Sequence, residues 1–248
     1  MPDRRSSPSA LLLACSALAS LGVASAARAE HAPPAAMPIL DRQAPDRESD
    51  PLVRRPVELR GAATMAWLGC SGSAPRALGV ADPCASLGAA TGVEATLVYR
   101  PLPRAALGAN VVASRFAWDP SRVFTNARSE GQAGWTLCSL LGRVSFVEEG
   151  RLEPWMAASV GIGFLSMEGG ADRRITRVGL VTRASAGLDV WLTGRWKFVA
   201  EVDAAWQPGG TAERCEDGVC LDGGSLARVV GRSLGAGLGL ALTFGDPL

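Results

Sequence analysis

Apolar and polar residues alternate with a period of two in several segments after residue 57. In 195–206, apolar side chains occupy every second position from Trp196 to Trp206, whereas Lys197, Glu201 and Asp203 lie between them. Successive side chains of a strand point to opposite faces of a sheet. The pattern therefore predicts a strand with one apolar and one polar face.

The same alternation predicts eight strands. They lie within 57–70, 92–100, 105–118, 135–148, 155–167, 178–192, 195–206 and 233–244. Only 105–118 is ambiguous, because both of its faces are largely apolar. A tilted strand of about ten residues with one apolar face is long enough to cross an outer membrane. No run of eighteen apolar residues follows the N-terminal segment, so membrane insertion would require a closed barrel.

The connections alternate between short and long. Tight turns are expected at 101–104, 148–151 and 193–195, and long polar loops at 71–88, 119–132, 168–177 and 207–225. This asymmetry is typical of an all-β, antiparallel, up-and-down transmembrane β-barrel with short periplasmic turns. A soluble lipocalin-like barrel has the same strand number, but the predicted apolar outer face would be an aggregation hazard in water.

Aromatic residues gather near both ends of the predicted strands, where a membrane barrel carries girdles at the lipid headgroups. The expected outer girdle comprises Trp67, Phe116, Trp118, Trp135, Phe164 and Trp206. The expected periplasmic girdle comprises Tyr99, Phe146, Trp155, Trp191, Trp196, Phe198 and Phe244. Trp155 and Trp191 fit imperfectly, because the alternation assigns them to the inward face.

The N-terminus has the organisation of a secretory signal peptide. Arg4 and Arg5 precede an apolar stretch over 10–27, and Ala27-Arg28-Ala29 fits the small-x-small cleavage rule. A lipoprotein signal ending at Cys15 is disfavoured, because it would leave too short an apolar core. We therefore expect a signal peptide over 1–29, a flexible periplasmic leader over 30–56 and a barrel over 57–248, with Sec-type secretion to the bacterial outer membrane.

Charge and cysteine content narrow the picture. Cleavage after residue 29 removes three of the 25 basic residues and one of the 24 acidic residues, so a nearly neutral chain remains and nucleic acid is not expected as a partner. In an oxidising compartment, Cys70 is expected to pair with Cys84, and Cys215 with Cys220. Four thiolates converging on a metal are less favoured. Cys138 would be left over as a small packed or lipid-facing residue.

Charged residues on the predicted inward faces are balanced in sign. They are Glu58, Arg60, Glu94, Arg100, Arg143, Arg183, Asp189, Lys197, Glu201 and Asp203. Eight strands leave an interior that side chains just fill, and buried charges need partners. We therefore expect a lumenal charge network, and this explanation is favoured over a catalytic role for Glu201 and Asp203.

The chain resembles the small bacterial outer-membrane β-barrel superfamily of OmpA-type and OmpW-type barrels. The resemblance covers 57–248 and includes a final strand, Gly-Leu-Gly-Leu-Ala-Leu-Thr-Phe, although Phe244 is followed by four more residues. Enzymes of this superfamily depend on a histidine in the barrel or at its rim. The sole histidine here, His31, lies in the leader.

These observations predict a non-enzymatic barrel without cofactor or metal, in contact with outer-membrane lipid, with a structural or surface-exposed interaction role. The extracellular or small-solute ligand is not specified by the sequence. Three alternatives stay open: a narrow, porin-like channel for small or apolar solutes, a soluble lipocalin-like binding barrel, and a histidine-independent enzyme. The spacing of Gly235, Gly237 and Gly239 within a strand does not fit a phosphate-binding loop.

Overall fold

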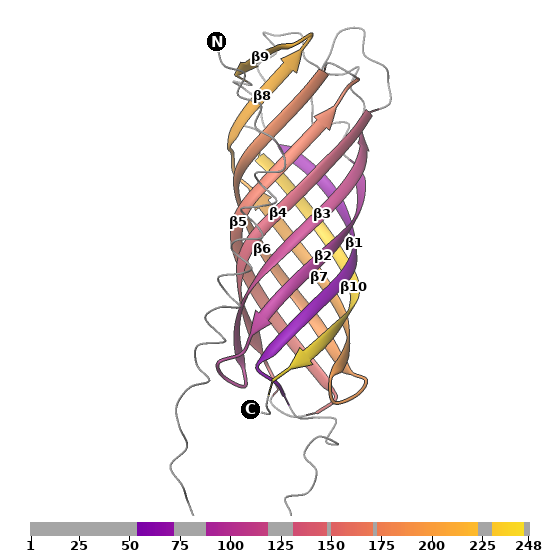
Figure 1. Cartoon of the computed structure of the whole chain (residues 1–248), viewed down its shortest axis with the longest axis vertical. Helices are drawn as coiled ribbons and strands as arrows, with labels where there is room; N and C mark the ends of the chain where they lie inside the picture. Colours follow the sequence, from indigo (N-terminus) through magenta and orange to yellow (C-terminus); the bar gives the residue numbers. More distant parts are fainter. Residues whose placement is uncertain are drawn as a thin grey trace, which may run out of the picture. The chain divides into compact units, whose positions relative to one another are not determined.

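The computed structural model describes residues 54–71, 88–118, 131–147, 150–170, 173–222 and 230–245. Eight long strands close into an antiparallel barrel (Figure 1). They are β1 (Val57–Ser71), β2 (Ala89–Tyr99), β3 (Ala105–Trp118), β4 (Gly131–Ser145), β5 (Leu152–Glu168), β6 (Arg173–Trp191), β7 (Trp196–Gln207) and β10 (Val230–Phe244). The described part of the chain contains no helix that is long and apolar enough to cross a membrane.

Each barrel strand pairs with the next barrel strand in the sequence, and the last strand, β10, pairs with the first, β1. The register of the closing pair runs from Val57 opposite Phe244 to Ser71 opposite Val230. The predicted all-β, up-and-down barrel of eight strands is therefore confirmed. Several strands are longer than predicted: β4 begins at Gly131 and β6 at Arg173, within stretches expected to be loops.

Two short strands were missed by the sequence analysis. β8 (Thr211–Glu216) and β9 (Val219–Asp222) form a hairpin within the expected loop 207–225, and β8 pairs with the first residues of β6. The hairpin turn contains Asp217 and Gly218, both with positive φ. Asp-Gly is a strong signal for such a turn, so this hairpin was open to prediction from the sequence.

The two ends of the barrel differ. We name the end with the short connections at 100–104, 146–151 and 192–195 the turn end, and the opposite end the loop end. The β8–β9 hairpin extends the sheet at the loop end, at the top of Figure 1. Along each strand, every second side chain points to the outer face of the barrel, and the side chains between them point into the lumen.

The outer face of the barrel is apolar. Among its most exposed side chains are Val93, Leu107, Leu140, Leu180, Leu234 and Leu238, each more than half exposed. An apolar surface of this extent suits lipid and not water. The side chains that the alternation assigned to the outside in β6, β7 and β10 lie there.

The aromatic girdles were predicted with errors. Trp67, Tyr99, Phe146, Trp196, Phe198, Trp206 and Phe244 are exposed on the outer face, and Phe164 is half-buried on it. In contrast, Phe116, Trp118, Trp135, Trp155 and Trp191 point into the lumen. The girdle prediction was wrong for these five, because the parity of a strand, and not position along it, decides which face a side chain occupies. For Trp155 and Trp191 the inward face that the alternation predicted is confirmed.

Candidate functional site: the charged lumen and its apolar plug

The structure places all ten predicted lumenal charges inside the barrel. Each is buried, with the exception of Asp203, which is partly exposed. They separate into two groups along the barrel axis, which we name the lower cluster, at the turn end, and the upper cluster, nearer the middle of the barrel. An apolar layer follows toward the loop end.

Apart from Arg54, which is described below, the lower cluster joins three carboxylates to four cations. Glu58, Glu153 and Asp189 are the carboxylates, and none of them is exposed. Arg143 lies 3.0, 3.3 and 2.6 Å from these three groups, in that order. Arg60, Arg100 and Lys197 supply the other cations.

Lys197 from β7 is the most enclosed cation of the lower cluster. Its Nζ atom lies 2.6 Å from Glu58 and 3.2 Å from Glu153, and it stands 4.3 Å from the centre of the Trp191 ring. Buried charges are tolerated only where partners of this kind replace water. Glu58 is bound in addition by Arg60 at 2.8 Å and Arg100 at 3.4 Å.

Trp155 lies within the lower cluster and not in a membrane girdle. Its Nε1 atom donates a hydrogen bond to Asp189 at 2.7 Å, and the guanidinium groups of Arg60 and Arg143 lie 4.8 and 4.6 Å from its ring centre. A Cβ at Gly187 would overlap the Trp155 ring. The indole therefore fits across the lumen because residue 187 has no side chain.

The upper cluster is centred on Arg183 of β6. Its guanidinium lies 2.7 Å from Glu94, 3.3 Å from Glu201 and 3.0 Å from Asp203. Arg60 lies 3.6 Å from Glu201 and so connects the two clusters. Glu94 also accepts hydrogen bonds from Thr96 at 2.9 Å and from Asn110 at 3.2 Å.

Two members of the lower cluster were missed by the sequence analysis. Glu153 lies two residues ahead of the predicted strand start at 155. It is followed by Pro154, which faces outward near the start of β5, where proline is tolerated. Extending the alternation by two residues would have found Glu153. Arg54 belongs to the expected leader, and it lies 4.0 Å from Glu153.

Arg54 and Arg55 cover the turn end of the lumen. Both are buried. Arg54 donates hydrogen bonds to the carbonyl oxygens of Pro103 and Val147, which belong to two different turns, and Arg55 donates to Gly245 after the last strand. Of the expected leader, residues 54–56 are the part that the structure describes, and here they are bound to the barrel.

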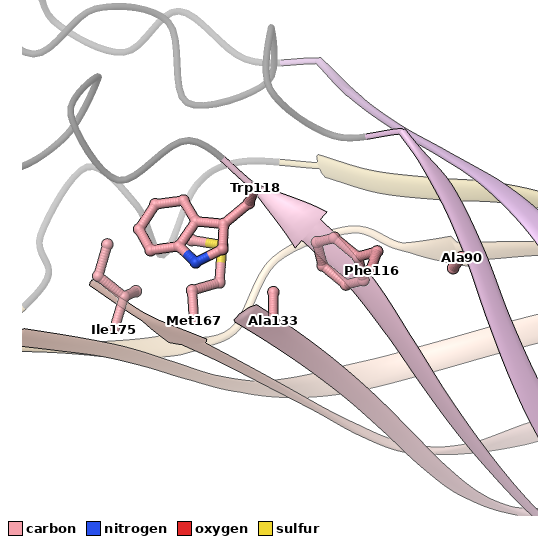
Figure 2. Close-up of a cluster of buried hydrophobic side chains, with 6 residues drawn as sticks. All are labelled: Ala90, Phe116, Trp118, Ala133, Met167 and Ile175. Atoms are coloured by element: carbon pink, nitrogen blue, oxygen red, sulfur yellow. The ribbon is translucent and has the colours of Figure 1, made fainter. Parts of the chain in front are cut away.

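An apolar plug occupies the lumen at the loop end. Its buried members, shown in Figure 2, are Ala90, Phe116, Trp118, Ala133, Met167 and Ile175. The Trp118 indole donates hydrogen bonds to the carbonyl oxygens of Gln132 and Glu168, which fix it between β4 and β5. A second apolar group, containing Val112, Leu137, Val181 and Ala205, lies nearby.

A small cavity remains among Glu94, Asn110, Arg143, Trp155 and Arg183. The volume open to the centres of water molecules is about 20 Å³. That volume accommodates about one water molecule. Its polar lining suits water and leaves no room for a solute of metabolite size.

The cysteines agree with the predictions in part. The disulfide between Cys215 and Cys220 is confirmed, and it joins β8 to β9 across the hairpin. Cys84 and the side chain of Cys70 lie outside the described residues, so that pairing stays a prediction. Cys138 is disulfide-bonded, with a partner outside the described side chains, so the expectation of a left-over cysteine was wrong.

Comparisons with known proteins give matches in structure only. No family model matches the chain, and no curated protein matches it in sequence. The outer membrane protein OprG from Pseudomonas aeruginosa superposes with a TM-score of 0.50 at 11% identity, covering 78% of this chain and 98% of that one. Neisserial surface protein A gives 0.49 at 14%, covering 76% and 97%, and AlkL gives 0.48 at 14%, covering 88% and 99%.

At such identities, likeness to OprG speaks to the fold alone. The chain has the fold of the small eight-stranded β-barrels of bacterial outer membranes.

Proposed function

We propose that this protein is a non-enzymatic outer-membrane barrel with a closed lumen, and that it acts through its framework and its surface-exposed loops. The observation that carries the proposal is the filled lumen: ion-paired side chains at the turn end are followed by an apolar plug at the loop end. A secretory signal over 1–29 and export by a Sec-type route belong to the same proposal.

A non-conducting lumen is supported by how the lumenal charges are engaged. With Glu153 and Arg54 included, the two clusters hold six acidic and six basic side chains. Several ion pairs join strands that are not neighbours, such as Arg183 of β6 with Glu94 of β2 and Arg143 of β4 with Glu58 of β1. An ion entering this space would have to break such pairs and then pass Phe116 and Trp118. Porins, in contrast, have many more strands and an open aqueous channel.

The proposal that the protein is not an enzyme is supported by the ion pairing of the lumenal carboxylates. Glu201 and Asp203, the strongest catalytic candidates, both lie within 3.3 Å of Arg183. A general acid or base must reach the proton that it transfers. These carboxylates are bound to arginine in the middle of a filled lumen. Enzymes of the superfamily that the sequence resembles depend on a histidine in the barrel or at its rim, whereas the single histidine of this chain, His31, lies in the expected leader.

Conductance across planar lipid bilayers tests the proposal. We expect the mature protein to give no steady ion current under conditions in which an open porin conducts. The variant Phe116→Ala/Trp118→Ala, which removes the two buried aromatic side chains of the plug, should conduct no more than a brief, small leak, because the charge clusters remain. Trp67→Ala/Trp206→Ala removes aromatic side chains from the outer face and serves as the matched control, with no leak expected. A steady, ion-selective current through the unmodified protein would contradict the closed lumen and favour the narrow channel.

A further inference from the structure

The Cys215–Cys220 disulfide lies in the hairpin at the loop end, at the top of Figure 1, and not in the barrel wall. Its two cysteines face each other in register on β8 and β9. β9 is the last strand of the sheet, and all four of its residues are exposed. Cys220 is exposed, whereas Cys215 is buried. A thiol in solution therefore reaches the sulfur of Cys220 more readily than that of Cys215.

A row of residues crosses four strands of the sheet and ends at this bond. Arg174 on β6 lies opposite Glu168 on β5 and, on its other side, opposite Cys215 on β8. Side chains directly opposite each other on antiparallel strands point to the same face, with Cβ atoms about 4.5–5.5 Å apart. Arg174 is exposed, and its guanidinium group is therefore within reach of the Cys215 sulfur.

A carboxylate lies on the same face, beside both cysteines. An oxygen of Glu213 is within 4.8 Å of the two sulfur atoms. Arg173 and Arg214 lie 3.3 and 3.0 Å from Glu216 and are engaged there. Arg174 is thus the arginine of the described hairpin region whose register places it beside a sulfur. The disulfide has a cation on the side of Cys215 and an anion close to both of its atoms.

These charges and exposures affect the reactivity of the bond. A disulfide is opened by a thiolate, and the rate depends on access to the attacked sulfur and on the stability of the thiolate that leaves. A neighbouring arginine stabilises a thiolate. Attack on the exposed Cys220, with departure of Cys215 beside Arg174, is therefore the favoured direction. Glu213 opposes both the approach and the departure of negative charge.

The charge of the hairpin also selects among thiols. Residues 211–222 contain four acidic side chains and one basic side chain. Such a surface repels anions and attracts cations, and salt screens the effect. Neutral and cationic thiols should therefore reach Cys220 faster than anionic ones.

We infer that the Cys215–Cys220 disulfide is a reactive group that exchanges with neutral or cationic low-molecular-weight thiols by attack on Cys220. The incoming thiolate sulfur bonds to Sγ of Cys220, the Cys215–Cys220 bond breaks, and its electron pair stays on Sγ of Cys215. A second thiol then displaces the first as a symmetric disulfide, and both cysteines end as thiols. The two thiols supply the two electrons and two protons. This activity goes beyond the proposed function and does not depend on a closed lumen.

The test uses the folded mature protein in detergent, in the parent variant Cys70→Ser/Cys84→Ser/Cys138→Ser. Cysteamine, a cationic thiol, is added, and N-ethylmaleimide stops the reaction at increasing times. Peptide mapping by mass spectrometry should find cysteamine on Cys220 and N-ethylmaleimide on Cys215 while the protein keeps its fast-migrating form on electrophoresis. Mapping reads each cysteine separately, so the unmodified protein serves equally if the parent does not fold. Cysteamine mainly on Cys215, or reaction only after unfolding, would overturn the inference.

Charge variants separate activation from simple exposure. Arg174→Gln should slow the first step about threefold, and Glu213→Gln should speed it about threefold, through the stability of the leaving thiolate. Arg174→Lys keeps the cation and should retain most of the rate. Arg115→Gln removes an exposed arginine from β3 and is the control, with no change expected. Equal rates for the parent, Arg174→Gln and Glu213→Gln would contradict the assigned roles.

Salt dependence tests the selection among thiols. Added salt should slow the reaction with cysteamine and speed the reaction with mercaptoacetate, which is anionic, because it screens the acidic hairpin. Rates that do not respond to salt, or that respond in the opposite sense, would show that the hairpin does not select thiols by charge.

Discussion

At the residue scale, the cations of the lower cluster are shielded from water, so the neighbouring carboxylates take the place of solvent. Lys197 is 1% exposed and lies within 3.5 Å of Glu58, Glu153 and Asp189. The cluster is a network in which each carboxylate has more than one cationic partner. Removal of one partner from a buried ion pair leaves an uncompensated charge, which costs more than the pair itself contributes.

We predict that Lys197→Met lowers the free energy of unfolding by about 3–5 kcal/mol. The measurement is urea unfolding in lipid vesicles, followed by tryptophan fluorescence. Arg151→Met, at an exposed turn residue, is the control and should change stability by less than about 0.5 kcal/mol. Glu58→Gln added to Lys197→Met should cost less than the sum of the two single changes, because the removed charges are partners. Full additivity, or a cost below 1 kcal/mol for Lys197→Met, would contradict the network.

Individual lumenal residues were open to prediction where the alternation was continuous. Glu58, Glu94 and Asp189 each follow from parity along an obvious strand, and the need of a buried charge for a partner then predicts pairing. Which cation meets which carboxylate was not open to prediction, because it depends on the stagger of strands around the barrel. The inward direction of Trp155 follows from the alternation, but the room for its ring beside Gly187 in the adjacent strand depends on the register of the two strands, which sequence spacing does not express.

At the scale of elements, the β8–β9 hairpin is set apart from the barrel strands. β8 pairs with β6 only over Arg173–Val178, beyond the point where β7 has ended against Thr182. The Cys215–Cys220 disulfide and the ion pairs of Glu216 with Arg173 and Arg214 hold it together. Val219 and Leu221 are exposed on β9. The hairpin is therefore restrained locally and contributes little to the barrel.

We predict that Cys215→Ser/Cys220→Ser loosens the hairpin alone. The chain-entropy account assigns about 2 kcal/mol to a bond that closes so short a loop, and this contribution should appear as local stability. Limited proteolysis, with cleavage sites mapped by mass spectrometry, should show faster cutting within 211–222. The thermal midpoint of the barrel in vesicles should be unchanged, within about 1 °C. A midpoint that falls by many degrees would mean that the hairpin is integral to the barrel.

The barrel strands themselves were predicted well, and their ends less so. The alternation identifies 178–192 because lipid and lumen demand opposite side chains at successive positions. At the loop end of β6 the alternation is interrupted by Arg173, Arg174 and Arg177, so these first residues of the strand were predicted as a loop. The short β9 strand has no buried face at all, so only the Asp217-Gly218 turn could have indicated it.

At the scale of the whole molecule, the barrel solves two problems with one alternating pattern. Closure of β1 on β10 leaves no strand edge in the lipid, where unpaired backbone groups would be costly. The same closure encloses charged side chains that lipid would not accommodate. Strand number and closure could be inferred from the sequence; the apolar plug could not, because Phe116 and Trp118 belong to the one strand whose two faces are both apolar.

The measurement that tests the central claim most directly is the electrophoretic mobility of the mature protein in lipid vesicles, with and without boiling, together with circular dichroism. The claim is a lipid-facing, closed β-barrel. It predicts a β-sheet spectrum and a fast-migrating form that shifts to slower migration after boiling. A monomer that is stable in water without lipid or detergent, and whose mobility does not respond to boiling, would contradict the claim and favour the lipocalin-like barrel.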